Sequence, residues 1–495
     1  MHTRTLLLSF VAMAYARTIQ KSDLVLPPEA AAKRRDAIEL FTGAYVDYKK
    51  YAWGNDSLAP LSKAPVNDRN GWGATIVDAM STMKVMGLNE LFAEAVDFSS
   101  KIDFSRSKTS DKVSVFETTI RYLGGLISAY ELGGKKDQAL IARARELGDK
   151  LSHAWIGLND FPYNILDFTT NTPDIESSGI AVAGTLVLEW GKLADYTGNI
   201  TYRHLAEKSM RRIGTNDAPL PGLPAQGIDP STGKPQGDYI TWGGGSDSYF
   251  EYLIKYGRLT NNASPEWTSR WLTAVDSSIR YLAQTAYGLR LTDACWNSYE
   301  KTGTGIGPEV FAYVGPDGSY AGASPSVSDL EFYQKNGFYI YNGYAYYDLR
   351  PEILESNFYA WRATGDIKYF NRAVAGLESI KYCRPGVGVA GIDDVRSTNS
   401  SYIDHTESFF FAEVIKYIYL TFDEPNKFSL DQYVFNTEAH PFEAPAPVES
   451  FKPPQRAQTS GHLASTAWTG EVPQISSVVG IPQKLSDVIE QGLNL

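Results

Sequence analysis

The feature that most constrains the fold is a glycine that ends one amphipathic stretch a few residues before another begins. The pattern occurs at Gly87, Gly133–Gly134, Gly198 and Gly365. In the stretches that follow, apolar residues recur at spacings of three and four, as in Leu140, Ala144 and Leu147, which marks one buried helical face. The repeats predict an all-α fold of αα-hairpins. Their irregular intervals favour a ring or solenoid over a bundle.

Two connections between the expected helices are much longer than a helical scaffold needs. Asn216–Gly245 and Gly303–Gly337 are rich in glycine and proline. Long loops within a compact domain usually carry function, so both are expected to rim a cleft. No change of composition divides residues 30–442, which predicts a single domain. Residues 443–495 begin with a proline-rich stretch of few large apolar residues, which predicts a flexible tail.

Charge and aromatic content narrow the classes of ligand. The formal net charge is −11, which leaves no basic excess for nucleic acid or for an anionic membrane surface. Aromatic residues make up 13% of the chain, which suits a sugar-binding cleft and equally suits ordinary core packing. A neutral polar ligand fits this composition best.

The N-terminus predicts entry into the secretory pathway. His2 and Arg4 precede the apolar run Leu6–Ala14, and Ala14-Tyr15-Ala16 matches a cleavage site, so residues 1–16 are expected to be a signal peptide. The run is shorter than the roughly 20 residues of a membrane span, so no membrane anchor is expected. The destination is the ER or Golgi lumen or the cell exterior.

Sequons and cysteines add two expectations. Asn55, Asn199 and Asn399 stand in sequons and are candidates for N-glycosylation. The two cysteines, Cys295 and Cys383, allow at most one disulfide, and the absence of a Cys/His cluster argues against zinc.

Carboxylates occur at unusual positions in apolar surroundings. Glu117 and Arg121 lie four residues apart on a helix with little polar face, which favours a buried functional pair over a surface ion pair. Asp247 follows the glycine run Gly243–Gly245, which suits close approach of a ligand, although a helix cap alone would also place it there.

Three more stretches, nearer the C-terminus, also place carboxylates at unusual positions. Glu352 and Glu355 share one helix face after a proline and repel each other, so a cation or ligand should lie between them, with Arg350 the nearest candidate. Glu407 and Glu413 stand in a strongly apolar helix, and Thr437 and Glu438 close the folded region. Such carboxylates suit oxygen-loving calcium, and a glycosidase needs one protonated and one ionised carboxyl group.

Taken in order, these stretches resemble the class I α-mannosidases, the inverting α-1,2-mannosidases of glycoside hydrolase family 47, over about residues 30–442. The motifs that carry the resemblance are long: GWGATIVDA from Gly71, VSVFETTIR from Val113, GGGSDSYFE from Gly243, LRPEILES from Leu349 and FNTEAHP from Phe435. The resemblance implies an (α/α)7 barrel of helical hairpins. It also implies a monomer that acts on high-mannose N-glycans or glycoproteins.

The resemblance also assigns roles. Glu117 resembles the family's acid, Glu352 its general base, and Asp247 the third catalytic carboxylate and alternative acid. Thr437 resembles the threonine that holds Ca²⁺ through its backbone and side-chain oxygens. The residues implied to bind substrate, or to lie just behind the bound sugar, are Arg121, Glu189, Arg350, Glu355, Glu407 and Glu438.

The resemblance is to the fungal secreted and Golgi-like type, with one departure. ER-type members carry arginine at the position of Gly245, whereas the fungal secreted and Golgi-like members carry glycine as here, which implies a wider cleft and removal of several mannoses. Between Asp247 and Glu352 the chain is a few dozen residues shorter than the family, because Tyr281–Tyr287 leads almost directly into Leu291–Cys295. Either most of one hairpin is missing from the barrel, or the coding sequence was assembled incompletely. The alternative function is a catalytically weak or inactive mannosidase-like lectin of glycoprotein quality control.

Overall fold

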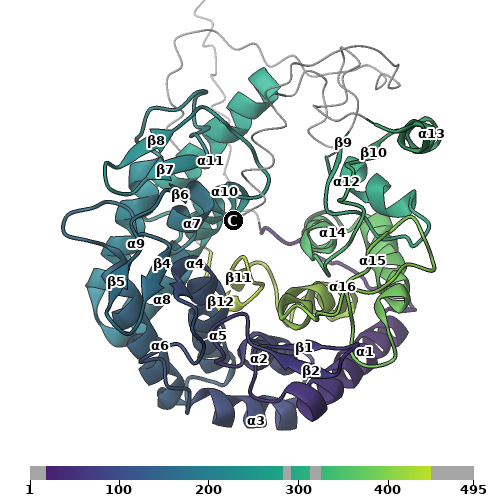
Figure 1. Cartoon of the computed structure of the whole chain (residues 1–495), viewed down its shortest axis with the longest axis horizontal. Coiled ribbons are helices and arrows are strands. Elements are labelled where there is room, and N and C mark those ends of the chain that lie inside the picture. Colours follow the sequence, from purple (N-terminus) through teal and green to yellow (C-terminus); the bar gives the residue numbers. More distant parts are fainter. Residues whose placement is uncertain (1–17, 283–290, 313–324, 448–495) are drawn as a thin grey trace, which may run out of the picture.

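A computed structural model describes residues 18–282, 291–312 and 325–447. The expected signal peptide, and residues 448–495 of the expected tail, lie outside the described residues. Helices form a ring of two layers, an (α/α)7 barrel, which confirms the all-α fold class (Figure 1). Among the described residues, no helix is both long and apolar enough to cross a membrane.

The inner layer faces a central lumen and consists of α2 (Ala74–Val85), α5 (Gly124–Leu132), α8 (Val187–Thr197), α10 (Asp247–Leu259), α14 (Glu352–Thr364) and α16 (Ile415–Phe422). Their outer partners are α3 (Asn89–Ser99), α6 (Gln138–Leu151), α9 (Ile200–Ile213), α11 (Glu266–Ser277), α15 (Ile367–Ser379) and, for α16, α1 (Ala30–Ala52). The sector between α11 and α14 holds α12 (Leu291–Glu300) and α13 (Val327–Asn336).

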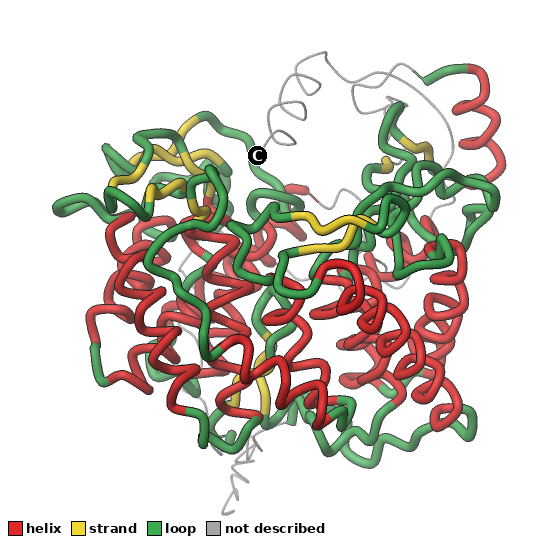
Figure 2. The backbone as a smooth tube through the Cα atoms, turned by 60° about the horizontal axis from the view of Figure 1, so that its bottom comes forward, coloured by secondary structure: helices red, strands yellow, loops and turns green. Residues whose placement is uncertain are grey.

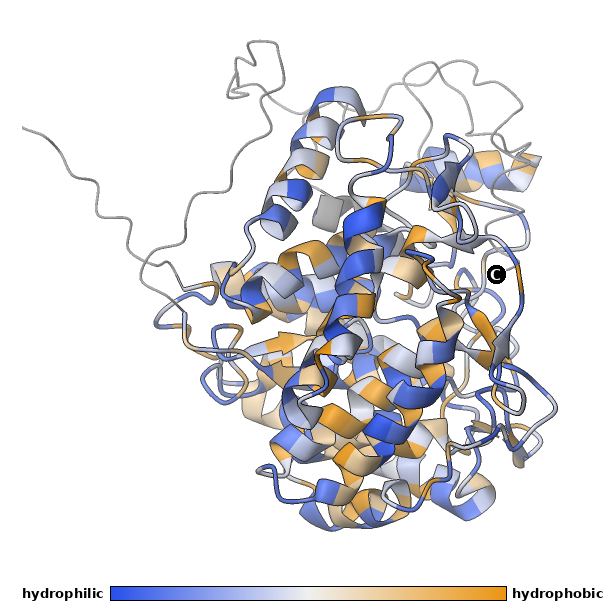
Figure 3. Cartoon of the chain, turned by 90° about the vertical axis from the view of Figure 1, so that its left-hand side faces the viewer, coloured by the Kyte–Doolittle hydropathy of each residue, from blue (hydrophilic) through white to orange (hydrophobic). Residues whose placement is uncertain are grey.

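The glycines predicted to end helices do lie between paired helices. Gly87, Gly134, Gly198 and Gly365 all have positive φ, between 65° and 76°, a conformation that glycine adopts without strain. The outer helices carry one hydrophobic and one hydrophilic face, as Figure 3 shows by the alternation of colours along them. The inner helices α2 and α5 are buried almost throughout, because helices flank them on both sides.

Shorter helical pieces connect these helices: α4 (Val115–Thr118), α7 (Ile180–Gly184), the 3₁₀ turns η2 (Ser152–Ala154) and η4 (Ile380–Cys383), and the π-helices η1 (Thr119–Leu123), η3 (Ser278–Leu282) and η5 (Phe410–Val414). Two of the π-helices lie directly beside expected site residues. Long loops and most strands gather at one end of the helices, and tight turns lie at the other (Figure 2).

The strands are short and antiparallel. They pair as β1 (Ser57–Ala59) with β2 (Ala64–Val66); β3 (Val113–Ser114), β4 (Ile165–Asp167) and β5 (Thr172–Pro173); β6 (Ser178–Gly179), β7 (Gly227–Asp229) and β8 (Lys234–Gln236); β9 (Phe311–Ala312) with β10 (Tyr339–Ile340); and β11 (Tyr433–Phe435) with β12 (Pro441–Glu443). In the last pair Val434 lies opposite Phe442, and this β11–β12 hairpin stands inside the ring (Figure 1).

The hairpin can enter the ring because the facing helix has no side chain in its way. A Cβ on Gly124 would lie 2.7 Å from Nδ2 of Asn436, the residue after β11. That amide donates hydrogen bonds to the carbonyl oxygen of Ile120, at 2.9 Å, and to Oε1 of Glu189, at 2.7 Å. Glycine at position 124 is therefore a packing requirement.

The sequons differ in their surroundings. Asn55 is enclosed: its Oδ1 accepts a 2.9 Å hydrogen bond from Asn67, and Ser57 of its sequon is only 2% exposed. Asn199 and Asn399 are both exposed. Asn199 caps α9 by accepting the backbone N–H of Thr201 with its Oδ1.

We expect Asn199 and Asn399, but not Asn55, to carry glycans when the chain is made in a eukaryotic secretory host. A glycan on Asn55 would disrupt the contact with Asn67 and crowd buried Ser57. Peptide mass spectrometry after PNGase F digestion in H₂¹⁸O labels each occupied asparagine. Full occupancy of Asn55 in folded protein would contradict this arrangement.

Candidate functional site

One cavity of about 1120 Å³ occupies the lumen of the ring and brings together carboxylates from distant parts of the chain. Its acidic lining residues are Glu117, Asp247, Glu251, Glu352, Glu355, Glu413 and Glu438. Thr437, Arg121 and Arg350 lie on the same lining. Eight of the ten predicted site residues therefore meet in one place, and Glu189 and Glu407 do not.

Glu117 forms one end of an ion-pair chain. Ser114 caps α4 by accepting the backbone N–H of Glu117, which fixes the start of the helix. Nε of Arg121 donates to Oε2 of Glu117 at 2.7 Å, and Nη1 of Arg121 contacts Glu438, which is 2% exposed. Burial alone would raise the pKa of Glu117, but Arg121 and Arg69 outweigh it and hold that pKa below its ordinary value.

Asp247 begins α10 and is exposed to the cavity. Residues 247, 251 and 255 are four apart, so α10 presents Asp247, Glu251 and Lys255 as one stripe along the lumen. Enclosure by the ring, and then the charges of Glu251 and Glu352, raise the pKa of Asp247 to about 6. Asp247 therefore holds a proton far more readily than Glu117 does.

Across the cavity from these α10 residues, α14 presents a second pair of carboxylates. Glu352 and Glu355 lie in its first turn, and Glu352 is exposed to the cavity. Enclosure raises the pKa of Glu352 above its ordinary value; Arg350 opposes the rise, and Glu309 and Glu251 add to it. Burial raises the pKa of Glu355 to about 7, although Lys255 lowers it.

Glu352 and Glu355 have different cationic neighbours. Nε of Arg350 donates to Oε2 of Glu309 at 2.8 Å, and its charge also opposes the rise in the pKa of Glu352. Glu355 is contacted by Lys255 of α10, whose Nζ lies 3.7 Å from its Oε1, and by the hydroxyl of Tyr417, which donates at 3.0 Å. Arg350, the nearest candidate in the sequence, therefore acts on Glu352, whereas the cation beside Glu355 comes from another helix.

Phe409 is a cavity residue to which the sequence assigned no role. Its ring lies between two guanidinium groups, 5.6 Å from that of Arg121 and 5.7 Å from that of Arg350. An aromatic ring beside fixed hydrogen-bond donors is suited to binding a pyranose. Its position two residues after Glu407 was visible in the sequence, but its orientation was not.

Glu413, also unassigned from the sequence, lines the cavity in place of Glu407. It lies on the π-helix η5 and is 6% exposed. Burial, and then the charge of Glu438, raise the pKa of Glu413 well above its ordinary value. A π-helix shifts the side-chain register relative to α-helical spacing, so α-helical periodicity does not predict which face Glu413 occupies.

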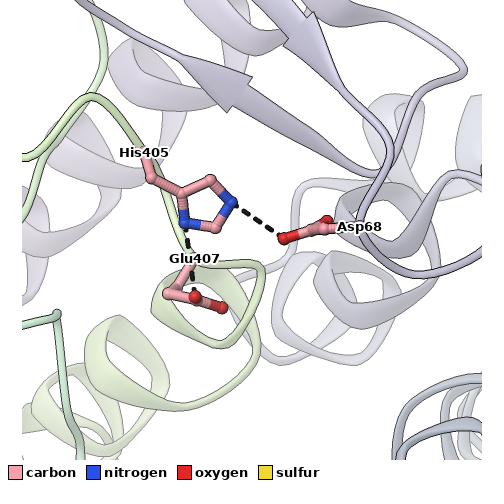
Figure 4. Close-up of side chains that lie close together, drawn as sticks. All are labelled: Asp68, His405 and Glu407. Carbon is pink, nitrogen blue, oxygen red and sulfur yellow. Dashed lines mark ion pairs between the residues drawn. The ribbon is translucent and has the colours of Figure 1, made fainter. Parts of the chain in front are cut away.

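Glu407 instead belongs to a polar cluster behind the cavity (Figure 4). Nδ1 of His405 lies 3.3 Å from Glu407, and Nε2 lies 3.0 Å from Asp68. Burial would lower the pKa of His405, but the two carboxylates raise it to about 10. A protonated ring has no lone pair for a metal, so this trio is an ion-pair cluster. Of the two positions implied for Glu407, at the substrate or just behind the bound sugar, its absence from the described lining of the cavity favours the second.

Glu189 is likewise placed behind the site. It is fully buried on α8 and accepts hydrogen bonds from the Tyr252 hydroxyl at 2.5 Å and from Asn436 at 2.7 Å. The Tyr252 oxygen also accepts the backbone N–H of Thr437 at 3.2 Å. Glu189 therefore positions the turn that carries Thr437, and the expectation that it lines the cleft is corrected. Burial raises the pKa of Glu189 to about 8.

The donors around Thr437 fit a hard divalent cation. Thr437 lies at the turn of the β11–β12 hairpin and lines the cavity with Glu438, Glu413 and Glu352. Burial raises the pKa of all three of these carboxyl groups, because the enclosed negative charge has too few positive partners. Oxygen donors with excess negative charge are the ligand chemistry that Ca²⁺ prefers.

Gly245 lies on the lining of the cavity, where only a glycine fits. It has φ +87°, and a Cβ there would lie 2.4 Å from Nε2 of Gln226. Gln226 also lines the cavity and donates to the carbonyl oxygen of Gly244 at 2.7 Å. Asn216–Gly245 therefore contributes to the lining, as expected. Gly303–Gly337 contributes none among its described residues, and residues 313–324 of that connection lie outside them.

The two cysteines are free thiols, Cys383 buried and Cys295 partly so. The disulfide left open by the sequence is not formed in this structure.

Comparisons with known proteins show which family this chain resembles. The sequence profile of glycosyl hydrolase family 47 matches residues 40–286 and 282–444. A probable mannosyl-oligosaccharide α-1,2-mannosidase 1B of Aspergillus clavatus is 36% identical over 516 aligned positions, covering 89% of this chain and 99% of that protein. The protein of the same name from Aspergillus niger is 35% identical over 518 positions, with the same coverage.

A solved structure agrees with these sequence matches. The α-1,2-mannosidase from Trichoderma reesei superimposes with a TM-score of 0.79 at 31% identity, covering 84% of this chain and 99% of that one. The fold, the cavity and the matched relatives lead to one conclusion. The chain belongs to glycosyl hydrolase family 47.

Proposed function

We propose that this chain is a calcium-dependent, inverting exo-α-1,2-mannosidase that trims high-mannose N-glycans in the secretory pathway or outside the cell. The observation that carries the proposal is that α10 and α14 present Asp247 and Glu352 to one cavity that Thr437 also lines. The names of the family relatives support the choice of sugar and linkage.

Glu352 acts as the general base. Its carboxylate opens onto the cavity, where a water molecule can lie between it and the anomeric carbon of a bound sugar. Burial raises the pKa of Glu352 and makes it a stronger base than an ordinary glutamate, while Arg350 limits the rise by favouring the ionised form.

Asp247 is the better proton donor of the two candidates. Glu117, the acid implied by the resemblance, is ion-paired to Arg121 and held ionised. Asp247, with a pKa of about 6, can be protonated when the leaving oxygen departs. Glu117 then orients Arg121 and a water molecule near the glycosidic oxygen.

Thr437 would hold Ca²⁺ through its backbone carbonyl and hydroxyl oxygens. Bound there, the ion would supply positive charge that orients the attacking water and the terminal sugar. Two hydrogen bonds fix this turn. Asn436, the residue before Thr437, donates to Glu189, and the backbone N–H of Thr437 donates to the hydroxyl oxygen of Tyr252.

The lectin alternative has one observation in its favour. The family profile matches in two pieces that meet at residues 282–286, and the 516-position alignment to the Aspergillus clavatus relative is longer than this 495-residue chain. The relative therefore carries residues that this chain lacks, which supports the expected shortening beyond Tyr281. A shortened wall would weaken turnover while leaving sugar binding in place.

The first prediction tests turnover and the metal. Glu352→Gln should lower mannose release from α-1,2-linked mannobiose by roughly 10²–10⁴-fold, because it removes the base. Glu378→Gln, an exposed change on α15 outside the cavity, is the matched control and should have no effect. EDTA should abolish wild-type activity and added Ca²⁺ restore it. Glycan binding without turnover in folded, calcium-loaded wild-type protein would establish the lectin.

The second prediction concerns pH. The proton on Asp247 is present below a pKa of about 6 and lost above it, so kcat/KM should fall as pH rises through about 6. Glu352 must be ionised, so the rate should also fall at low pH. The Asp247→Asn variant should lose most of its activity, and its remaining kcat/KM should no longer fall as pH rises through about 6. If that fall is unchanged in the variant, Glu117 is the acid.

The third prediction concerns specificity. Because Gly245 places no side chain on the lining where ER-type members carry arginine, digestion of a high-mannose N-glycan should proceed past the first mannose to products lacking several α-1,2-linked residues. Mass spectrometry of the released glycans follows each product. Trimming that stops after one mannose would contradict the wider cleft.

A further inference from the structure

Arg69 is a cation that three carboxylates share. Its Nη1 lies 3.6 Å from Asp68, its Nε 3.7 Å from Glu117 and its Nη2 3.9 Å from Glu407. Among the described residues, its side chain donates one hydrogen bond, from Nη1 to the carbonyl oxygen of Asp68 at 3.0 Å. The position of the guanidinium group among the three carboxylates is therefore set by charge attraction rather than by a hydrogen bond to one of them.

The backbone of Arg69 is fixed, so a change of charge nearby can move only its side chain. Its backbone N–H donates to Oδ2 of Asp56 at 2.8 Å, and its carbonyl oxygen accepts from the Tyr122 hydroxyl at 2.8 Å. Asp56 is fully buried and also accepts the backbone N–H of Gly71 at 2.6 Å. The guanidinium group can therefore turn while the chain that carries it stays in place.

His405 is the cation that serves the two carboxylates competing with Glu117 for Arg69. Its ring lies 3.0 Å from Asp68 and 3.3 Å from Glu407 (Figure 4). Burial alone would raise the pKa of Asp68, but the hydrogen bond from His405 and the charge of Arg69 lower it to about 2. Burial would likewise raise the pKa of Glu407, but His405 above all lowers it. Both carboxylates are thus held in the ionised form by the same histidine.

The backbone on both sides of His405 is held without help from the imidazole ring. The N–H of Thr406 donates to the carbonyl oxygen of Leu58 in β1 at 2.8 Å. Oδ1 of Asp404 accepts the backbone N–H of Leu61 at 2.7 Å. A substitution at position 405 therefore changes the charge between these segments and leaves their backbone contacts in place.

The second cation beside Glu117 cannot take over from Arg69. Arg121 is shared, because its Nη1 also contacts Glu438 and lies 3.6 Å from Oδ2 of Asp78. The ion pair between Arg69 and Glu117 is therefore an additional constraint on Glu117, at the opposite end of that carboxylate's surroundings from the buried pair.

Loss of the charge at position 405 would change which carboxylate holds Arg69. Among the described residues, Arg69 would then be the remaining ion-pair partner of both Asp68 and Glu407. Two carboxylates without another cation attract the guanidinium group more strongly than one that keeps Arg121. Arg69 would move toward them and away from Glu117.

We propose that His405 is a positioning residue for hydrolysis, whose positive charge satisfies Asp68 and Glu407 and so leaves Arg69 beside Glu117. The inference rests on the proposed function, in which Glu117 orients Arg121 and a water molecule near the glycosidic oxygen. Neither His405 nor Arg69 belongs to the described lining of the cavity, so both act through Glu117.

Kinetics on the full chain with saturating Ca²⁺ test the role of the charge. His405→Gln should lower kcat for α-1,2-linked mannobiose roughly tenfold and leave KM nearly unchanged, because the cavity lining is intact. His405→Lys keeps the positive charge and should retain most of kcat. His153→Gln makes the same change at an exposed histidine of η2 and is the matched control, with no expected effect. A His405→Lys variant as slow as His405→Gln would overturn the proposal.

A double-mutant cycle tests whether His405 acts through Arg69. Arg69→Met should lower kcat by a similar factor, and His405→Gln added to Arg69→Met should cost little more. Melting temperatures of the single and double variants show that each is folded. Fully additive losses in kcat would overturn the proposal, because they would mean that His405 acts by another route.

A crystal structure of His405→Gln separates this proposal from the proposed function. The distance from Nε of Arg69 to Oε2 of Glu117 should become clearly longer than 3.7 Å, and in His405→Lys it should stay close to that value. An unchanged distance in His405→Gln would refute the positioning role even in an active enzyme. Folded wild-type protein that releases no mannose would refute the proposed function, while the position of Arg69 would still decide whether His405 holds it.

Discussion

The amide of Asn436 connects parts of the chain that are more than two hundred residues apart. Its Nδ2 donates to Ile120 and Glu189, and its Oδ1 accepts the backbone N–H groups of Glu438 and His440, at 3.0 and 2.7 Å. Buried polar groups must find partners, and this side chain satisfies several at once. The β11–β12 hairpin is thereby fixed inside the ring, and Thr437 at its turn lines the cavity.

The cavity is organised by an imbalance of charge. Seven carboxylates line it, and among the described lining residues the cations beside them are Arg121, Lys255, Arg258 and Arg350. The cations are unevenly placed, so the pKa of Glu117 is held below its ordinary value, whereas the pKa of Asp247 is raised to about 6 and that of Glu355 to about 7. Environments that separate the pKa values of neighbouring acids are what acid–base catalysis requires. The same excess of carboxylates is the ligand chemistry that a hard divalent cation prefers.

Two facing helices, α10 and α14, are joined across the lumen by an ion pair. The lumen side of α10 carries Asp247 and Lys255. Nζ of Lys255 lies 3.7 Å from Oε1 of Glu355 on α14, the helix that begins with Glu352. This contact helps to hold the helices that carry Asp247 and Glu352 in register.

The sequence by itself determined the helical hairpins, the family resemblance and the carboxylates of the cavity, because glycine stops, apolar spacing and long motifs are local. Eight of the ten predicted site residues line the cavity. Only the tertiary structure decided that Glu189 and Glu407 lie behind it and that Glu413, Phe409 and Lys255 lie in it. The physical reason is that π-helices at Thr119–Leu123 and Phe410–Val414 shift the side-chain register, and that ion pairs between distant helices leave no local pattern.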